Sequence, residues 1–87
     1  MKILGFKRIE KKDSFLYYIK KYSAVAVIEV FARQMALPVT FSIEVNPLGL
    51  KNIDLEPLPK TLDYPVLPVT KSIKEYIVRL DEENKLP

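Results

Sequence analysis

The clearest pattern in the chain is an alternation of apolar and polar residues on both sides of one turn, between Val39 and Pro59. Alternation with a period of two is typical of strands that bury one face. Residues 46–49, Asn-Pro-Leu-Gly, favour a type I turn followed by a left-handed glycine. That combination is the usual three-residue hairpin loop with a bulge. We therefore predict a hairpin over residues 39–56, with residues 47–49 as its loop.

The length of this loop fixes the register of the hairpin. With three loop residues, Ile43 faces Ile53 and Phe41 faces Leu55, so the central apolar side chains share one face. A loop of two residues sets Phe41 against Asp54, which no half-buried sheet tolerates. The three-residue loop is therefore the prediction, and its apolar face offers a surface on which a helix can pack.

The segments before the hairpin are rich in residues that favour strands. Residues 2–9 contain isoleucine, leucine and phenylalanine ahead of a polar turn, and predict a strand. Residues 14–20 and 24–33 are dense in aromatic and β-branched residues, and predict two more. Residues 33–38 are then interpreted as a loop, with Pro38 opening the next strand. Because no glycine or proline interrupts residues 14–34, a helix within this segment is the alternative.

The texture changes after the hairpin. Four prolines lie between residues 57 and 68, which predicts an extended segment over 57–70 rather than regular structure. Ser72 and Glu75 then form the pattern of a capping box, and apolar residues follow at helical spacing. We predict a helix over residues 72–83.

These elements predict a fold of the α+β class, formed by residues 1–87 as a single domain. An antiparallel sheet of four to five strands carries one C-terminal helix packed on a face. The alternative order is β-α-β-β-α, with a helix within residues 14–34. A chain of 87 residues is long enough for one modest hydrophobic core.

Composition narrows the chemistry. The chain has no cysteine and no histidine, which removes thiolate ligands, the commonest metal ligand and the commonest general base. Asp54 and Glu56 share one face of the predicted hairpin, but alternating polar residues on a solvated face give the same pattern. We therefore expect no catalytic site, no metal and no cofactor. No apolar run is long enough to span a bilayer, so a cytoplasmic protein without a membrane partner is expected.

Charge divides the chain into two parts. Residues 1–33 hold eight basic and three acidic residues, a net charge of +5, whereas residues 34–87 carry −2. Cationic groups interleaved with aromatic rings can bind phosphates and stack on unpaired bases. Nucleic-acid binding through the N-terminal half is therefore the alternative function. The candidate residues for such a surface are Lys7, Arg8, Lys11, Lys12, Lys20 and Lys21.

Tyrosine is the commonest aromatic residue in the chain. Tyrosine is enriched in protein interfaces, and an open sheet leaves strand edges that pair with other chains. The leading hypothesis is therefore a small non-enzymatic module for protein interaction or assembly, which self-associates as a homo-oligomer or joins a larger complex. The candidate interface aromatics are Tyr17, Tyr18, Tyr22 and Tyr64.

Overall fold

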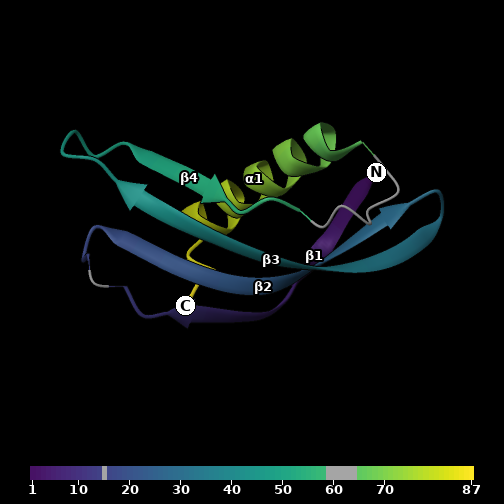
Figure 1. The fold of residues 1–87 in the computed structure, drawn as a ribbon, viewed down its shortest axis with the longest axis horizontal. Helices are drawn as coiled ribbons and strands as arrows, with labels where there is room; N and C mark the ends of the chain where they lie inside the picture. The colour runs from purple at the N-terminus through teal and green to yellow at the C-terminus, as the bar shows by residue number, and fades with distance from the viewer. Residues whose placement is uncertain (15, 59–64) are drawn as a thin grey trace.

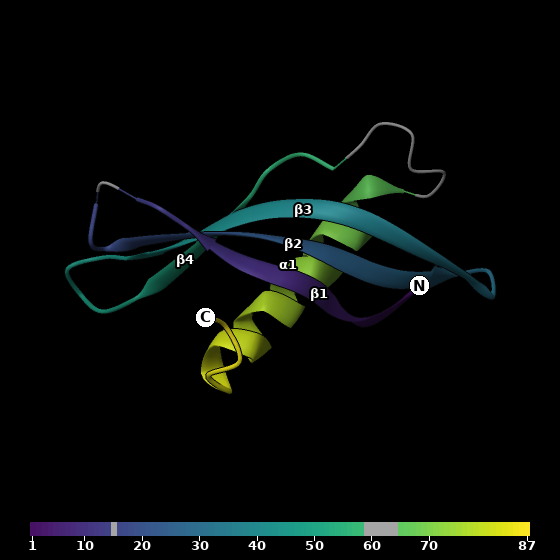
Figure 2. The same cartoon turned by 90° about the horizontal axis from the view of Figure 1, so that it is seen from below.

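The fold is a four-stranded antiparallel sheet with one helix packed across a face, in the computed structural model, which describes residues 1–14, 16–58 and 65–87 (Figure 1). The elements run in the order β1 (Lys2–Lys12), β2 (Ile19–Val30), β3 (Arg33–Val45), β4 (Lys51–Leu55) and α1 (Val66–Glu82). The strands lie side by side in chain order, so β1 and β4 are the two edges. This arrangement confirms the predicted α+β class with a C-terminal helix. We call the side of the sheet that carries α1 the inner face and the opposite side the outer face (Figure 2).

The β3–β4 hairpin has the predicted register. Ile43 pairs with Ile53 and Phe41 with Leu55. Gly49 has a φ of 82°, and its N–H donates to the Asn46 carbonyl at 2.9 Å. The Asn46 side chain also accepts hydrogen bonds from the backbone N–H groups of Leu48 and Leu50. The turn chemistry of these residues therefore determines where β4 begins.

The segment between β1 and the hairpin is stranded, which excludes the helix within residues 14–34. Its predicted boundaries are wrong, because a single long strand, β2, replaces the two strands at 14–20 and 24–33. The reversal falls at Phe31 and Ala32, with φ values of 51° and 63°. Left-handed φ at both central positions is the conformation of a type I′ turn, which usually requires asparagine or glycine. These two residues carry no such signal.

The predicted loop at 33–38 is part of β3, including Pro38. The Thr40 carbonyl accepts a hydrogen bond from Glu56, so the even-numbered residues of β3 turn their backbone groups toward the β4 side. Beyond Thr40, β4 no longer pairs with β3. Pro38 therefore occupies a position where its missing N–H removes no bond from the ladder.

Helix α1 begins at Val66, six residues before the predicted start at Ser72. Pro68 falls in the first helical turn, where a missing N–H costs no hydrogen bond, so its presence did not exclude a helix. Residues 66–70 are thus helical rather than extended, while residues 59–64 of the predicted segment lie outside the described residues. The helix end is close to the prediction. Asn84 has a φ of 56°, and Lys85 N–H donates to the Leu80 carbonyl in a Schellman motif.

The core lies between α1 and the inner face. Val69, Ile73, Ile77 and Leu80 form the buried stripe of the helix. The sheet contributes alternate residues of β2 and β3, including Tyr22, whose ring stacks on Phe41 at 5.3 Å between centroids. Helix α1 thereby covers one face of the sheet and leaves the outer face open among the described residues.

Candidate functional site

The edge of β4 is the most accessible backbone in the sheet. Hydrogen bonds from Asn46 to Leu50 and from Glu56 to Thr40 show that the even-numbered residues of the hairpin bond to each other. In this ladder the odd-numbered residues of β4 turn their N–H and C=O groups away from β3. Ile53 therefore presents a backbone donor and acceptor at the open edge, while its side chain lies on the inner face opposite Ile43.

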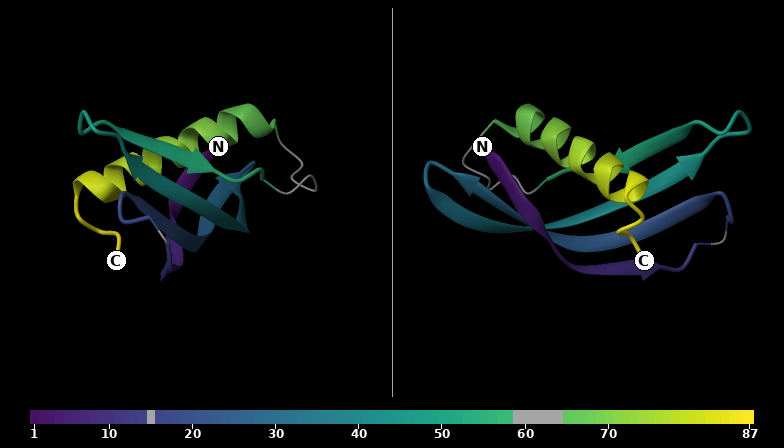
Figure 3. Two further views of the ribbon diagram at one scale, coloured as in Figure 1. Left: turned by 60° about the vertical axis from the view of Figure 1, so that its left-hand side comes forward. Right: turned by 180° about the vertical axis from the view of Figure 1, so that it is seen from behind.

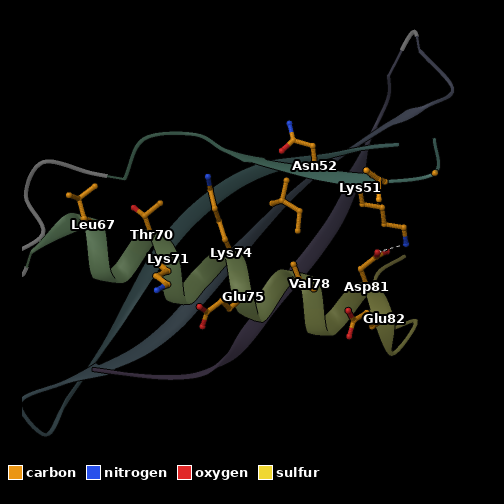
Figure 4. A pocket seen from close by; sticks show the side chains of 13 residues that line it. Lys51, Asn52, Leu67, Thr70, Lys71, Lys74, Glu75, Val78, Asp81 and Glu82 are labelled. Carbon is orange, nitrogen blue, oxygen red and sulfur yellow. Dashed lines mark hydrogen bonds and ion pairs between the residues drawn. The ribbon is translucent and has the colours of Figure 1, made fainter. Parts of the chain in front are cut away.

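A groove of about 870 Å³ lies beside this edge, between β4 and α1. Figure 4 shows the helix running alongside the strand, with Lys74 extending from α1 toward β4. Apolar side chains line the groove at several points, among them Ile53 and Val78, and Val78 is 41% exposed. An unpaired strand edge next to a partly apolar groove is an arrangement that accepts an extended peptide as an added strand.

One ion pair joins the two walls of the groove. Lys51 on β4 donates to the Asp81 carboxylate on α1 at 2.5 Å (Figure 4). The hydrogen bond to Asp81 and its negative charge raise the pKa of Lys51 above 10.5. Because both side chains are partly exposed, the pair contributes little to stability and instead holds the strand against the helix at this end. Lys74 takes part in none of the ion pairs found among the described residues.

The six candidate basic residues do not form one surface. Lys7 faces Val25 and Lys12 faces Lys21 across the β1–β2 ladder, which puts these lysines on the outer face. Lys11 pairs with Tyr22 and Lys20 with Ile43, which puts them on the inner face. Arg8 lies where the β1 register shifts, at a φ of 53°. The strand period therefore divides the predicted anion-binding surface between two sides of the sheet.

The candidate tyrosines also separate. Tyr17 is 95% exposed and packs edge to face against Tyr18, with 5.6 Å between ring centroids. Both line a second hollow, of about 750 Å³, between the β1–β2 and β3–β4 connections. Tyr22 is 2% exposed, and its hydroxyl donates to the Pro87 carbonyl at 3.1 Å, so its assignment as an interface residue is wrong. Tyr64 lies outside the described residues.

The acidic residues show no arrangement for metal chemistry in the part of the chain that the structure describes. Asp54 and Glu56 are exposed on the outer face of the β3–β4 hairpin, as their register requires. Residues 1–14, 16–58 and 65–87 contain no group of three or more carboxylate side chains placed to hold a metal ion. Among the same residues, the helix is neither long nor apolar enough to cross a bilayer.

The groove was not predicted from the sequence, for a specific reason. The predicted helix starts at residue 72, so Leu67, Thr70 and Lys71, which line one end of the groove, were assigned to an extended segment. The available signal was the spacing of Val66, Val69 and Ile73, which continues the apolar stripe of the helix backward through Pro68.

Comparison with known proteins gives a family and no further likeness. The model of the BB_0187 family matches residues 1–82, so the chain belongs to that family. No curated protein and no solved structure matches the chain.

Proposed function

We propose that this member of the family is a non-enzymatic protein-interaction module that binds an extended segment of a partner protein along β4. The observation that carries the proposal is the outward-facing N–H and C=O of Ile53 beside the β4–α1 groove. Backbone hydrogen bonds at such an edge supply affinity, and the adjacent groove supplies selectivity for alternate side chains.

The groove specifies the chemistry of the bound segment. A residue paired with Ile53 places its side chain on the inner face, next to Ile53 and Val78. Apolar side chains suit this position. Lys74 extends toward β4 without an ion pair among the described residues, so an acidic side chain in the segment gains a charged partner (Figure 4). The preferred ligand is an extended peptide that alternates apolar and polar residues and carries a carboxylate near Lys74.

Nucleic-acid binding is the weaker alternative, because the basic residues that suggested it are divided between the two faces of the sheet. A phosphate backbone tracked by one face meets only part of the set. Titration with single-stranded and double-stranded DNA and RNA across a salt series separates the two functions. Binding that weakens steeply with salt and is abolished by Lys12→Glu with Lys21→Glu supports the alternative and contradicts the peptide proposal.

Selection from a random peptide display library tests the proposal directly. The selected peptides should alternate apolar and polar residues, and their affinity should depend on the open edge. Ile53→Pro removes the outward N–H but no bond of the β3–β4 ladder, so it should weaken binding at least about tenfold. Ile53→Val, which keeps the N–H and most of the side chain, is the control and should bind nearly as the parent does.

A second pair of variants tests the groove itself. Val78 and Val66 are 41% and 42% exposed on the same helix, but only Val78 lines the groove. Val78→Asp should weaken peptide binding strongly, because it places a carboxylate against the apolar side chains of the ligand. Val66→Asp should leave binding unchanged. Equal effects of the two substitutions, or selected peptides with no alternation, contradict the proposed site.

A further inference from the structure

The outer face of the sheet is apolar at its centre, although no described residue covers it. The run Ala24–Ile28 in β2 buries Ala24, Ala26 and Ile28 under α1, while Val25 and Val27 lie on the outer face. Their cross-strand neighbours on β3 are Pro38 and Ala36, which are exposed. A strand that is apolar on both faces is typical of a sheet covered on both sides.

Charges on the outer face are divided between the two halves of the sheet. One row of cross-strand neighbours reads Lys12, Lys21, Ser42 and Asp54 from β1 to β4. Glu56 extends the acidic side along β4. Like charges directly opposite each other, as at Lys12 and Lys21, destabilise a sheet unless an acidic partner compensates them.

We propose that a second copy of this chain covers the outer face. A two-fold axis parallel to the strands, between β2 and β3, places β1 of one copy over β4 of the other. Val25 and Val27 then pack on Pro38 and Ala36 of the second copy, and Lys12 lies opposite Asp54 of the second copy. Each contact occurs twice, as a two-fold interface requires, and basic residues meet acidic residues on both sides.

The shape of the sheet indicates the strength of this association. The strands bend around α1, so the outer face is convex and two copies touch mainly along β2 and β3 (Figure 3). A flat four-stranded face of this length offers roughly 600 Å² per copy from strand spacing and rise alone. That area is below the roughly 800 Å² per partner of a standard stable interface. The dimer therefore forms at micromolar concentrations, and the long lysine side chains bridge the gap toward the edges.

Sedimentation equilibrium over a range of protein concentrations tests this inference. The parent chain should show a monomer–dimer equilibrium that weakens as salt is added. Val27→Asp should raise the dissociation constant at least roughly tenfold, because it places a carboxylate in the apolar centre. Val66→Asp, the same change on α1, should have no effect, and thermal unfolding checks that both variants fold. A parent chain that stays monomeric at millimolar concentration and low salt overturns the proposal.

Charge reversal tests the orientation of the two copies. Lys12→Glu and Asp54→Lys should each weaken self-association, because each creates two like-charge contacts. An equimolar mixture of the two variants should form a heterodimer, in which the two introduced side chains pair at one contact and the unchanged Lys12 and Asp54 pair at the other. No contact within one copy produces this rescue, since β1 and β4 are opposite edges of the sheet. A mixture as weakly associated as the separate variants overturns the proposed orientation.

The dimer and the peptide site are independent, because they use opposite faces of the molecule. Val78→Asp should leave the monomer–dimer equilibrium unchanged, and Val27→Asp should leave peptide affinity unchanged. If peptide binding fails while self-association follows the predicted pattern, the proposed function is wrong and the dimer stands. The reverse result overturns the dimer alone.

Discussion

The two edges of the sheet differ in how well they can pair with another chain. Strand β1 is 11 residues long but is broken by register shifts on either side of its centre, and it carries five basic residues: Lys2, Lys7, Arg8, Lys11 and Lys12. Strand β4 has only five residues, yet its pairing to β3 is regular and a groove lies beside it.

This difference indicates which edge is available for binding. Bulges and lysines on an edge strand are common devices against unwanted pairing, because they bend the backbone and prevent a second strand from aligning. Strand β1 has both devices. Strand β4 has neither a bulge nor a left-handed residue within it, and its neighbour α1 provides apolar contact. The protected edge and the available edge therefore lie on opposite sides of one small sheet.

The largest expected effect is on the turn that positions β4. Gly49→Val places a β-branched residue at a φ of 82°, which should cost about 2 kcal/mol in the free energy of unfolding. No atom lies within 4 Å of the position of an added Cβ, so the cost is backbone strain and not a clash. Urea denaturation measures it. Gly49→Asn, which tolerates this conformation, should cost much less, and equal stability of the valine variant and the parent would show that the turn is wrongly assigned.

The next effect concerns the buried tyrosine of β2, whose cross-strand neighbour on β1 is Lys11. Tyr22→Phe keeps the ring on Phe41 but loses the hydrogen bond to the Pro87 carbonyl, at a cost of about 1 kcal/mol near neutral pH. Thermal or urea unfolding of both proteins measures this difference.

The same substitution should change the response to alkaline pH. Burial, aided by the charge of Asp81, raises the pKa of Tyr22 above 10.0 in the folded state. Stability linked to this group is thus fully present below pH 10.0 and is lost as pH rises through the folded pKa. The phenylalanine variant lacks this loss, so the two proteins should converge in stability above pH 10.0. A stability difference that stays constant with pH contradicts the assignment.

A smaller effect is expected within the protected edge itself. Arg8 has a φ of 53°, so Arg8→Gly relieves strain and should raise the free energy of unfolding by up to about 1 kcal/mol. Arg8→Ala removes the same charge without the relief and serves as the control. Neither substitution should alter the affinity of a peptide bound at β4. A loss of affinity in both would place the binding edge at β1.

The smallest effect is on the ion pair between β4 and α1. Asp81→Asn removes the negative charge and the hydrogen bond that raise the pKa of Lys51, so that pKa should fall back toward 10.5. An NMR titration of the Lys51 side chain measures the shift. Because the pair is exposed, the variant should unfold at nearly the parent denaturant concentration. A large loss of stability would show that the pair holds β4 in place.

Much of the fold follows from local chemistry in the sequence. The register of the β3–β4 hairpin is predicted correctly because Asn46, Pro47 and Gly49 each suit one backbone conformation of the turn. The β2–β3 turn at Phe31 and Ala32 is not predictable in this way. Its left-handed backbone is imposed by the long pairing of β2 with β3 on both sides, and propensity gives no sign of it.

The candidate site is less predictable because it depends on how distant segments meet. The groove requires α1 to begin at Val66, and a proline at residue 68 suggested a later start. The basic residues were identified from charge alone, and only the cross-strand register shows that Lys11 and Lys12 lie on opposite faces. Composition therefore indicates a charged half of the chain, but the pairing of strands decides which charges share a surface.

Amide hydrogen exchange at β4, measured by NMR with and without a selected peptide, tests the availability of this edge most directly. An added strand should protect the N–H groups of Lys51 and Ile53, which face outward, and leave those of Asn52 and Asp54, which already bond to β3, nearly unchanged. The amides of β1 should not respond. Uniform protection along β4, or protection confined to β1, would contradict the account.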